Sequence, residues 1–244
     1  MTIATRAPLQ GAHIVIIGGS TGIGLATAKA AKAAGASVTL VGRTAAKLEA
    51  AAREIGETST TVADIADRKS VEVVFAGMAS VDHVVITAGG LVGGRLAETD
   101  PDVLLAALQE RIAGSIYAIK AALPLMSATG SIVLTGGQFS DRPSGNGVSV
   151  VSAAVRGIEA LARALALELK PIRVNVISPG YLDTPLFDPL GREARTALLA
   201  EVAEALPGGR VGRAAEVAEA ILFLLNNAYM NGEVLHIDGG GRFV

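Results

Sequence analysis

The chain has 244 residues, of which 50% are apolar and 3% aromatic, and it carries a formal net charge of −2 at pH 7. This charge balance gives no electrostatic support for binding to nucleic acid or to an anionic membrane. The chain has no cysteine, which excludes disulfide bonds and thiolate chemistry, and its three histidines are scattered, so no metal site is expected.

The apolar segments of the chain are short. Arg, Lys, Asp or Gly interrupts each of them before it reaches the roughly 18 residues that a membrane-spanning helix needs. Residues 1–11 lack the apolar core of a signal peptide. We therefore expect a cytoplasmic protein whose core consists of Ala, Val, Leu and Ile.

Apolar runs alternate with segments of helical periodicity along the whole chain. The runs predict seven strands, at residues 13–17, 37–41, 60–63, 83–87, 131–135, 173–177 and 234–237. Helices are predicted between them at residues 22–34, 45–55, 68–79, 101–126, 148–169 and 214–225, with a shorter helix near 192–205. This alternation predicts an α/β fold: one Rossmann-like domain over residues 1–244, with a doubly wound parallel sheet of seven strands flanked by helices.

The connections that follow the strands are the places to look for a site, because ligands of a doubly wound sheet bind beyond the carboxyl ends of its strands. Two of the later connections are long, and their loops are rich in Gly and Pro. We expect them to bind the substrate, at about residues 136–147 and 181–205.

The first predicted strand ends in a glycine-rich turn, Gly18-Gly19-Ser20-Thr21-Gly22-Ile23-Gly24, and the first helix follows directly. Gly18 allows a tight turn, while Gly22 and Gly24 allow backbone N–H groups and the helix to approach a pyrophosphate. The helix N-terminus adds a partial positive charge. A structural turn is the alternative interpretation, but the position of the motif at a strand–helix junction favours a dinucleotide site.

Further motifs follow along the chain. Asp64 comes after the third predicted strand and Ala88-Gly89 after the fourth, and the later motifs are Arg173-Val174-Asn175-Val176-Ile177-Ser178-Pro179-Gly180 with Thr184, and His236-Ile237-Asp238-Gly239-Gly240. Together with the glycine-rich turn they resemble the short-chain dehydrogenase/reductase family, and the resemblance covers essentially the whole chain. It implies a Rossmann-like fold, a nicotinamide dinucleotide, a small-molecule substrate and often a homotetramer.

The resemblance also implies which residues bind the cofactor. The phosphates would be held by Gly18, Ser20, Thr21, Gly22, Ile23 and Gly24. The adenine would meet Asp64 and Ile65, and the ribose would pass beside Ala88 and Gly89. The nicotinamide end would be held by Pro179, Gly180, Leu182 and Thr184. For Ile65 and Leu182, an ordinary role in a loop is a credible alternative.

The residues after the second predicted strand bear on the choice between NAD and NADP. An acidic residue there would accept the adenine-ribose hydroxyls of NAD, but this chain has Gly42, followed by Arg43 and Thr44. A guanidinium suits a 2′-phosphate, and the Thr44 hydroxyl would add a donor. The alternative is that Arg43 is a solvated surface charge, and Thr21 stands where many NADP-using relatives carry a second basic residue. We expect NADP(H) to be preferred over NAD(H).

The catalytic side chains of the family are Asn, Ser, Tyr and Lys. Tyr is the acid/base, Lys lowers its pKa, Ser binds the substrate oxygen and Asn positions a water relay. The register set by residues 163–169 places Val151 at the Tyr position and Val155 at the Lys position, with Gly137 for Ser and Arg111 for Asn. The resemblance therefore implies a divergent member that lacks the catalytic set.

Three groups are candidate replacements. Ser152 forms an i, i+4 pair with Arg156 on one helix face, although a hydroxyl is a poor acid and the register is shifted by one residue. Tyr181 carries a phenol near the nicotinamide end, or it only lines the pocket. Arg111 would stabilise a developing oxyanion, or it only pairs with a carboxylate such as Glu110.

Two functions remain open at this point. The first is an NADP(H)-dependent oxidoreductase that transfers hydride to or from a carbonyl, alcohol or imine by a non-standard mechanism. An iminium substrate, already charged, would need little help from an acid. The second is a non-catalytic dinucleotide-binding regulator, or the inactive partner in a hetero-oligomer with an active paralogue. A homo-oligomer, dimer or tetramer, is expected for the enzyme.

Overall fold

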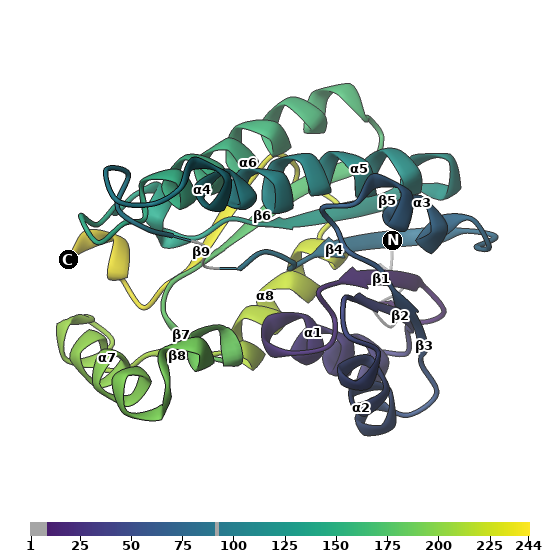
Figure 1. The fold of residues 1–244 in the computed structure, drawn as a ribbon. Coiled ribbons are helices and arrows are strands. Elements are labelled where there is room, and N and C mark those ends of the chain that lie inside the picture. The colour runs from purple at the N-terminus through teal and green to yellow at the C-terminus, as the bar shows by residue number, and fades with distance from the viewer. Residues whose placement is uncertain (1–8, 91–92) are drawn as a thin grey trace.

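The computed structural model describes residues 9–90 and 93–244 and contains one seven-stranded parallel sheet in the order β3-β2-β1-β4-β5-β6-β9. The chain starts at the centre of this sheet, builds outward to β3, and then crosses over to β4 and builds toward β9 (Figure 1). This is the predicted doubly wound arrangement. The strands are β1 (His13–Ile17), β2 (Ser37–Gly42), β3 (Ser59–Val62), β4 (Val81–Ile86), β5 (Met126–Thr135), β6 (Arg173–Pro179) and β9 (Val234–Ile237).

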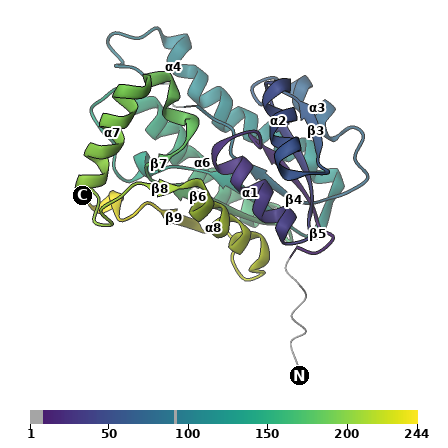
Figure 2. The same ribbon diagram turned by 90° about the horizontal axis from the view of Figure 1, so that it is seen from below.

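Helices cover both faces of the sheet (Figure 1). One face carries α1 (Gly22–Ala33), α2 (Ala45–Ile55) and α8 (Ala214–Asn226). The other carries α3 (Arg68–Phe75), α4 (Pro101–Leu108), α5 (Gly114–Ala122) and α6 (Ser149–Glu168). Figure 2 shows α7 (Arg192–Ala205) at the edge of the molecule, next to the short paired strands β7 (Leu182–Asp183) and β8 (Gly212–Arg213).

The core lies on both sides of the sheet because successive side chains of a strand point to opposite faces. In β1, Val15 and Ile17 join the cluster under α3, α5 and α6, whereas Ile14 and Ile16 join the cluster under α1 and α8. All four side chains are buried. This two-sided burial explains why the central strands read as unbroken apolar runs in the sequence.

The helix predicted over residues 101–126 is present, but it is irregular and the regular α-helix ends earlier than predicted. The structure divides this segment into α4, a π-helical turn at Gln109–Ala113, α5 and a short 3₁₀ turn at Leu123–Leu125, and β5 begins at Met126. Pro124 explains the early end of α5, because a proline inside a helix lacks the N–H donor and clashes with the preceding turn. Helix α3 likewise ends at Phe75, before the predicted 79, and the β7–β8 pair was not predicted.

Within the described residues, no helix combines the length and the apolar character needed to cross a membrane. In the same part of the chain, His, Asp and Glu side chains form no group of three that could hold a metal ion.

Candidate functional site

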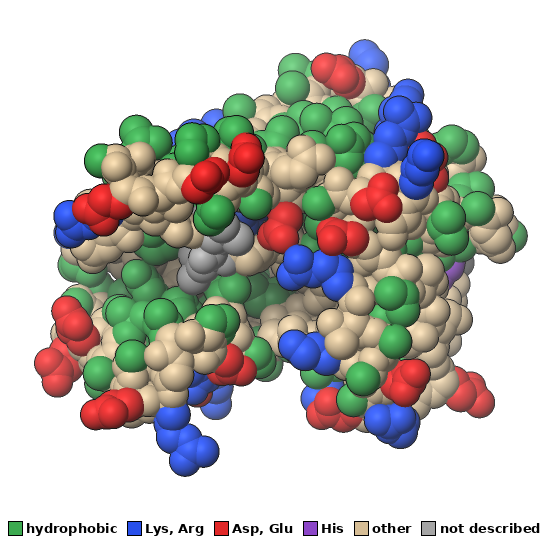
Figure 3. Space-filling view, in the orientation of Figure 1, with side chains coloured by type: hydrophobic (Ala, Val, Ile, Leu, Met, Phe, Trp, Pro, Cys, Tyr) green, Lys and Arg blue, Asp and Glu red, His purple; other side chains and the backbone are tan. Residues whose placement is uncertain are grey.

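A cleft of about 360 Å³ opens at the carboxyl ends of β1, β2, β4, β5 and β6. Figure 3 shows the molecule hollowed between the side that carries α4 and the side that carries α7. This is the edge at which ligands of doubly wound sheets bind, and the volume falls in the range of small-molecule sites.

Most of the predicted cofactor residues come together in this cleft. Its lining includes Gly18, Ser20, Thr21, Gly22, Ile23, Gly24, Arg43, Thr44, Ile65, Ala88, Gly89, Pro179, Gly180 and Thr184. Asp64 and Leu182 are not among the lining residues. The Asp64 carboxylate accepts the Ala66 N–H at 2.9 Å within its own turn, and Leu182 is buried in the core under α1 and α8.

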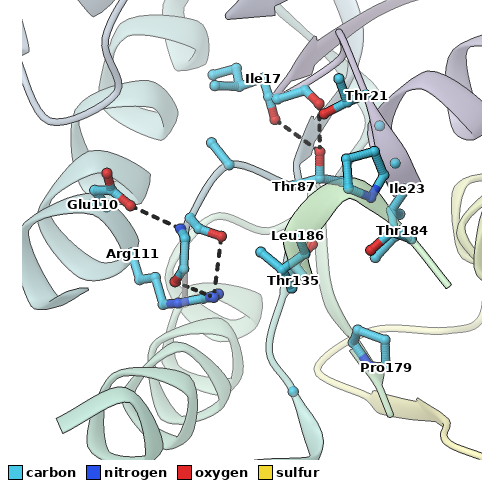
Figure 4. Close-up of a pocket in the computed structure, with 18 of the residues that line it drawn as sticks. Ile17, Thr21, Ile23, Thr87, Glu110, Arg111, Thr135, Pro179, Thr184 and Leu186 are labelled. Carbon is cyan, nitrogen blue, oxygen red and sulfur yellow. Dashed lines mark hydrogen bonds between the residues drawn. The ribbon is translucent and has the colours of Figure 1, made fainter. Parts of the chain in front are cut away.

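The glycine-rich turn is packed too closely for side chains at two positions. Gly18 has a φ of +92°, and a Cβ there would lie 2.6 Å from the Ala88 nitrogen. A Cβ on Gly24 would lie 2.2 Å from the Gly18 carbonyl oxygen. The Thr87 hydroxyl lies within hydrogen-bonding distance of both the Ile17 and Gly18 carbonyls, at 3.2 and 3.3 Å (Figure 4). The turn is therefore fixed against the end of β4.

The N-terminus of α1 faces the cleft with its backbone donors available. Thr21 is the N-cap residue, but its side chain makes no capping hydrogen bond, and the first turn of the helix holds no acidic residue. A Cβ on Gly22 would point across the cleft toward Thr184, which it would approach to 3.7 Å. Backbone N–H groups at the positive end of a helix, beside a position without a side chain, fit the pyrophosphate of a nicotinamide dinucleotide.

The end of the cleft beside β2 is basic. Arg43, Thr44 and Lys47 line it, and both cations are exposed to solvent. Nη1 of Arg43 lies 3.1 Å from Oε1 of Glu110, which extends from the π-helical turn. Lys47 was not predicted from the sequence, although its position three residues after Thr44, at the start of α2, was a usable signal.

Arg111 enters the cleft from the same π-helical turn (Figure 4). Its side chain is buried, with 8% exposure, and its Nη2 donates to the carbonyls of Gly89 and Gly90 at the long distances of 3.4 and 3.2 Å. Nε has no hydrogen-bond partner among the described residues. Burial lowers the pKa of Arg111 from its usual value, but a guanidinium stays protonated in proteins. Arg111 is thus a buried cation with spare donor capacity beside the cleft.

The part of the cleft lining that comes from α6 is an apolar wall formed by Val151 and Val155. Val151 and Val155 are 1% and 2% exposed and pack with Ala107 of α4. Gly137, after β5, faces this wall, since a Cβ on it would lie 3.7 Å from Val155. These three positions carry no group that can donate or accept a proton.

The chain matches known proteins over nearly its whole length. A family model described as enoyl-(acyl carrier protein) reductase matches residues 18–241. A short-chain dehydrogenase/reductase of Stachybotrys chlorohalonatus is 33% identical over 95% of this chain and 97% of its own. The chain belongs to the short-chain dehydrogenase/reductase family. A 3-oxoacyl-[acyl-carrier-protein] reductase of Bos taurus is also 33% identical, over 92% of this chain and 95% of its own.

A solved structure of a small-chain dehydrogenase in complex with NADPH superposes with a TM-score of 0.85 at 31% identity, covering 96% of this chain and 100% of the other. The chain is therefore an oxidoreductase of the short-chain dehydrogenase/reductase family with the family's α/β fold. Nicotinamide dinucleotides and small organic substrates are the ligands of this family.

Of the two remaining catalytic candidates of this short-chain dehydrogenase/reductase, only Tyr181 lines the cleft. Its ring stacks on Phe187 and contacts Phe139 edge-on, with ring centroids 5.8 and 6.1 Å apart. Burial and, second, the charge of Glu201 raise the pKa of the Tyr181 phenol above its ordinary value. The phenol therefore stays protonated at neutral pH and can donate a hydrogen bond.

The structure places Ser152 outside the cleft lining. Its hydroxyl oxygen is buried without a hydrogen-bond partner among the described residues. Arg156 also turns away from the cleft, to Asp141 at 2.9 Å and Glu159 at 2.8 Å. The i, i+4 pair of these two residues is therefore not brought to the cofactor side.

Proposed function

We propose that the chain is an NADP(H)-dependent oxidoreductase that acts on a small organic carbonyl, alcohol or imine without the tyrosine–lysine pair of its family. The observation that carries the proposal is the uncapped N-terminus of α1 behind a glycine-rich turn, in a cleft whose β2 end is basic. When bound, the nicotinamide supplies or accepts the hydride. This chain's residues bind the dinucleotide, orient it and shape the space for the substrate.

The residues after β2 support NADP(H) over NAD(H). Gly42 offers no carboxylate to the adenine-ribose hydroxyls, whereas Arg43, Thr44 and Lys47 supply cations and a hydroxyl for a 2′-phosphate. The related dehydrogenase that was solved in complex with NADPH is consistent with this preference.

Because Val151 and Val155 do not titrate, the site lacks an acid or base at these two positions. A positioned acid or base contributes about 10²–10⁴ in rate, and valine cannot supply this contribution. We propose that Arg111 stabilises negative charge that develops on a substrate oxygen, and that the protonated Tyr181 phenol donates a hydrogen bond to the substrate. An iminium substrate, which carries its own positive charge, would need neither group as an acid.

The substrate side of the cleft combines two segments. Phe139 comes from the segment 136–147, and Tyr181, Leu186 and Phe187 come from the segment 181–205. We propose that these two segments form the substrate site, with an apolar and aromatic surface that excludes water.

The apolar wall also favours a second candidate function. A member with no titratable group at Val151, Val155 and Gly137 could bind the dinucleotide without turnover. It would then act as a regulator, or as the inactive subunit of a hetero-oligomer with an active paralogue.

A titration followed by an assay separates the two functions. We expect purified protein to bind NADPH at least tenfold more tightly than NADH, by isothermal titration calorimetry, and Arg43→Ala to remove most of the difference. Arg53→Ala, which removes an exposed arginine from the last turn of α2, is the control. NADPH oxidation should then be measured on neutral ketones and on cyclic iminium ions.

The outcomes of this experiment are distinct. Oxidation with either substrate class supports the enzyme, and faster turnover of iminium ions identifies the route without an acid. Binding without oxidation across the panel favours the non-catalytic function. If neither dinucleotide binds, both functions are wrong.

The proposal also includes the cellular location and the oligomeric state of the protein. We propose a cytoplasmic homo-oligomer, a dimer or tetramer. Exposed apolar side chains on helices of the α4–α6 face, Leu105, Ile116 and Leu167, are consistent with a subunit interface. Sedimentation equilibrium would measure the oligomeric state.

A further inference from the structure

We propose that Glu110 lowers the selectivity of this site for NADP(H) over NAD(H), because its carboxylate competes with the 2′-phosphate for the guanidinium of Arg43. The inference rests on the proposed function, since it concerns how the same site binds the dinucleotide. It assigns a specificity-determining role to a residue that the family motifs do not include.

The geometry shows that Glu110 is held in place independently of Arg43. Its Oε2 accepts the Gly90 N–H at 3.0 Å, while its Oε1 lies 3.1 Å from Nη1 of Arg43 (Figure 4 shows Glu110). The Glu110 side chain is 14% exposed and that of Arg43 is 63% exposed. Arg43 can therefore move to a ligand, whereas the Glu110 carboxylate stays fixed beside the cleft.

The conformation of the chain explains why this carboxylate lies here. Glu110 is the second residue of the π-helical turn between α4 and α5, and such turns are often found at functional sites. The neighbouring Gln109 side chain donates to the Ala66 carbonyl at 3.2 Å and so ties the turn to the loop after β3. The turn brings a negative charge to the end of the cleft that otherwise carries Arg43 and Lys47.

Electrostatics give the direction of the effect. A 2′-phosphate that binds Arg43 brings up to two negative charges close to the fixed Glu110 carboxylate, which is only 14% exposed and is therefore only partly screened by solvent. The phosphate must also displace one carboxylate contact from the guanidinium. NADH has hydroxyl groups at this position and meets neither cost. Glu110 therefore weakens NADPH binding more than NADH binding.

The test uses Glu110→Gln in the full chain. The amide keeps the size of the side chain and an oxygen acceptor for the Gly90 N–H, so the turn should be preserved, and only the charge is removed. Glu72→Gln is the matched control, because it breaks an exposed ion pair of 2.8 Å with Arg68 in α3. The probes are 2′,5′-ADP and 5′-AMP, which differ in the 2′-phosphate, together with NADPH and NADH, all measured by calorimetry.

We expect Glu110→Gln to tighten binding of 2′,5′-ADP and NADPH about tenfold and to change binding of 5′-AMP and NADH less than threefold. Glu72→Gln should change none of the four. In an Arg43→Ala background, Glu110→Gln should change NADPH binding less than threefold, because the contested guanidinium is absent and no longer holds the 2′-phosphate close to the carboxylate. Arg43 is exposed, so this background tests the competition without disturbing the core.

Three results would overturn the inference. The first is NADPH binding that Glu110→Gln leaves unchanged or weakens; weaker binding would mean that Glu110 positions Arg43 for the phosphate. The second is an equal gain for NADH and NADPH. The third is a tenfold gain that persists without Arg43. If the unmodified protein binds no dinucleotide, the proposed function itself fails, and the two failures are thereby distinguished.

Discussion

Arg111 and Arg173 are both buried arginines, but their guanidinium groups differ in how well their hydrogen bonds are satisfied. This difference indicates a functional role for Arg111 and a structural role for Arg173. Arg173 donates to the carbonyls of Leu224, Met230 and Leu225 at 2.7–3.0 Å. Arg111 makes only the two long contacts to the Gly89 and Gly90 carbonyls, and its Nε has no partner among the described residues. A buried cation that is poorly satisfied costs stability, so its presence beside a cleft points to a ligand.

We predict opposite effects on stability when each of these arginines is replaced by methionine. Arg111→Met should raise the free energy of unfolding by about 1 kcal/mol, because it removes, at similar volume, a buried charge that forms no ion pair among the described residues. Arg173→Met should lower the free energy of unfolding by about 3 kcal/mol or more, because the buried carbonyls of Leu224 and Leu225 lose their donor. Urea denaturation measures both. Destabilisation by Arg111→Met similar to that by Arg173→Met would show that Arg111 is structural.

At the scale of elements, the π-helical turn joins two helices that pack on different neighbours. Helix α4 contacts α6, and α5 contacts α3. A π turn holds one residue more than the α-helical turn that it replaces. The extra residue is therefore accommodated in the turn, and α4 and α5 each keep the packing on their neighbouring helix. The bulge thereby directs Glu110 and Arg111 toward Gly89 and Gly90.

We predict that deletion of Gln109 joins α4 and α5 into a regular helix and leaves the fold intact. Gln109 is exposed, so the melting temperature should fall by less than about 5 °C. The contact of Glu110 with the Gly90 N–H should be lost, and hydrogen–deuterium exchange at Gly90 should accelerate at least tenfold. Gln109→Ala keeps the chain length and is the control. Unchanged exchange at Gly90 after the deletion would contradict this role of the turn.

These elements also show what the sequence could and could not reveal. The strands were predictable because burial on both faces requires apolar residues at successive positions, as in Val15 and Ile16. The π turn was not, because it depends on how two packed helices share one extra residue. The pairing of Arg43 with Glu110 joins positions 67 residues apart and arises only in the folded chain. The same holds for Ser152, whose direction is set by how α6 packs on the sheet.

At the scale of the whole molecule, a buried histidine in the central sheet links folding to pH. His83 lies on β4, is 8% exposed, and its Nδ1 is 2.9 Å from the Ser131 hydroxyl on the adjacent strand β5. Burial is the main cause that lowers the pKa of His83, to about 4, and Arg173 adds to the effect while Asp82 opposes it. The native state therefore holds this imidazole neutral at pH values where the unfolded chain is protonated.

We predict that this difference makes the protein less stable in mild acid. The pKa of His83 is about 6.5 in the unfolded chain and about 4 in the native state, so the unfolded state binds more protons between these values. The stability associated with the neutral His83 imidazole is fully present above pH 6.5. As the pH falls from 6.5 to 4, the free energy of unfolding decreases on this account by up to about 3 kcal/mol. His83→Gln keeps a partner for Ser131 but does not titrate. Urea denaturation of both proteins from pH 7.5 to 4.5 should show a shallower decline for the variant, whereas parallel declines would mean that His83 is protonated in the native state or that carboxylates alone cause the loss.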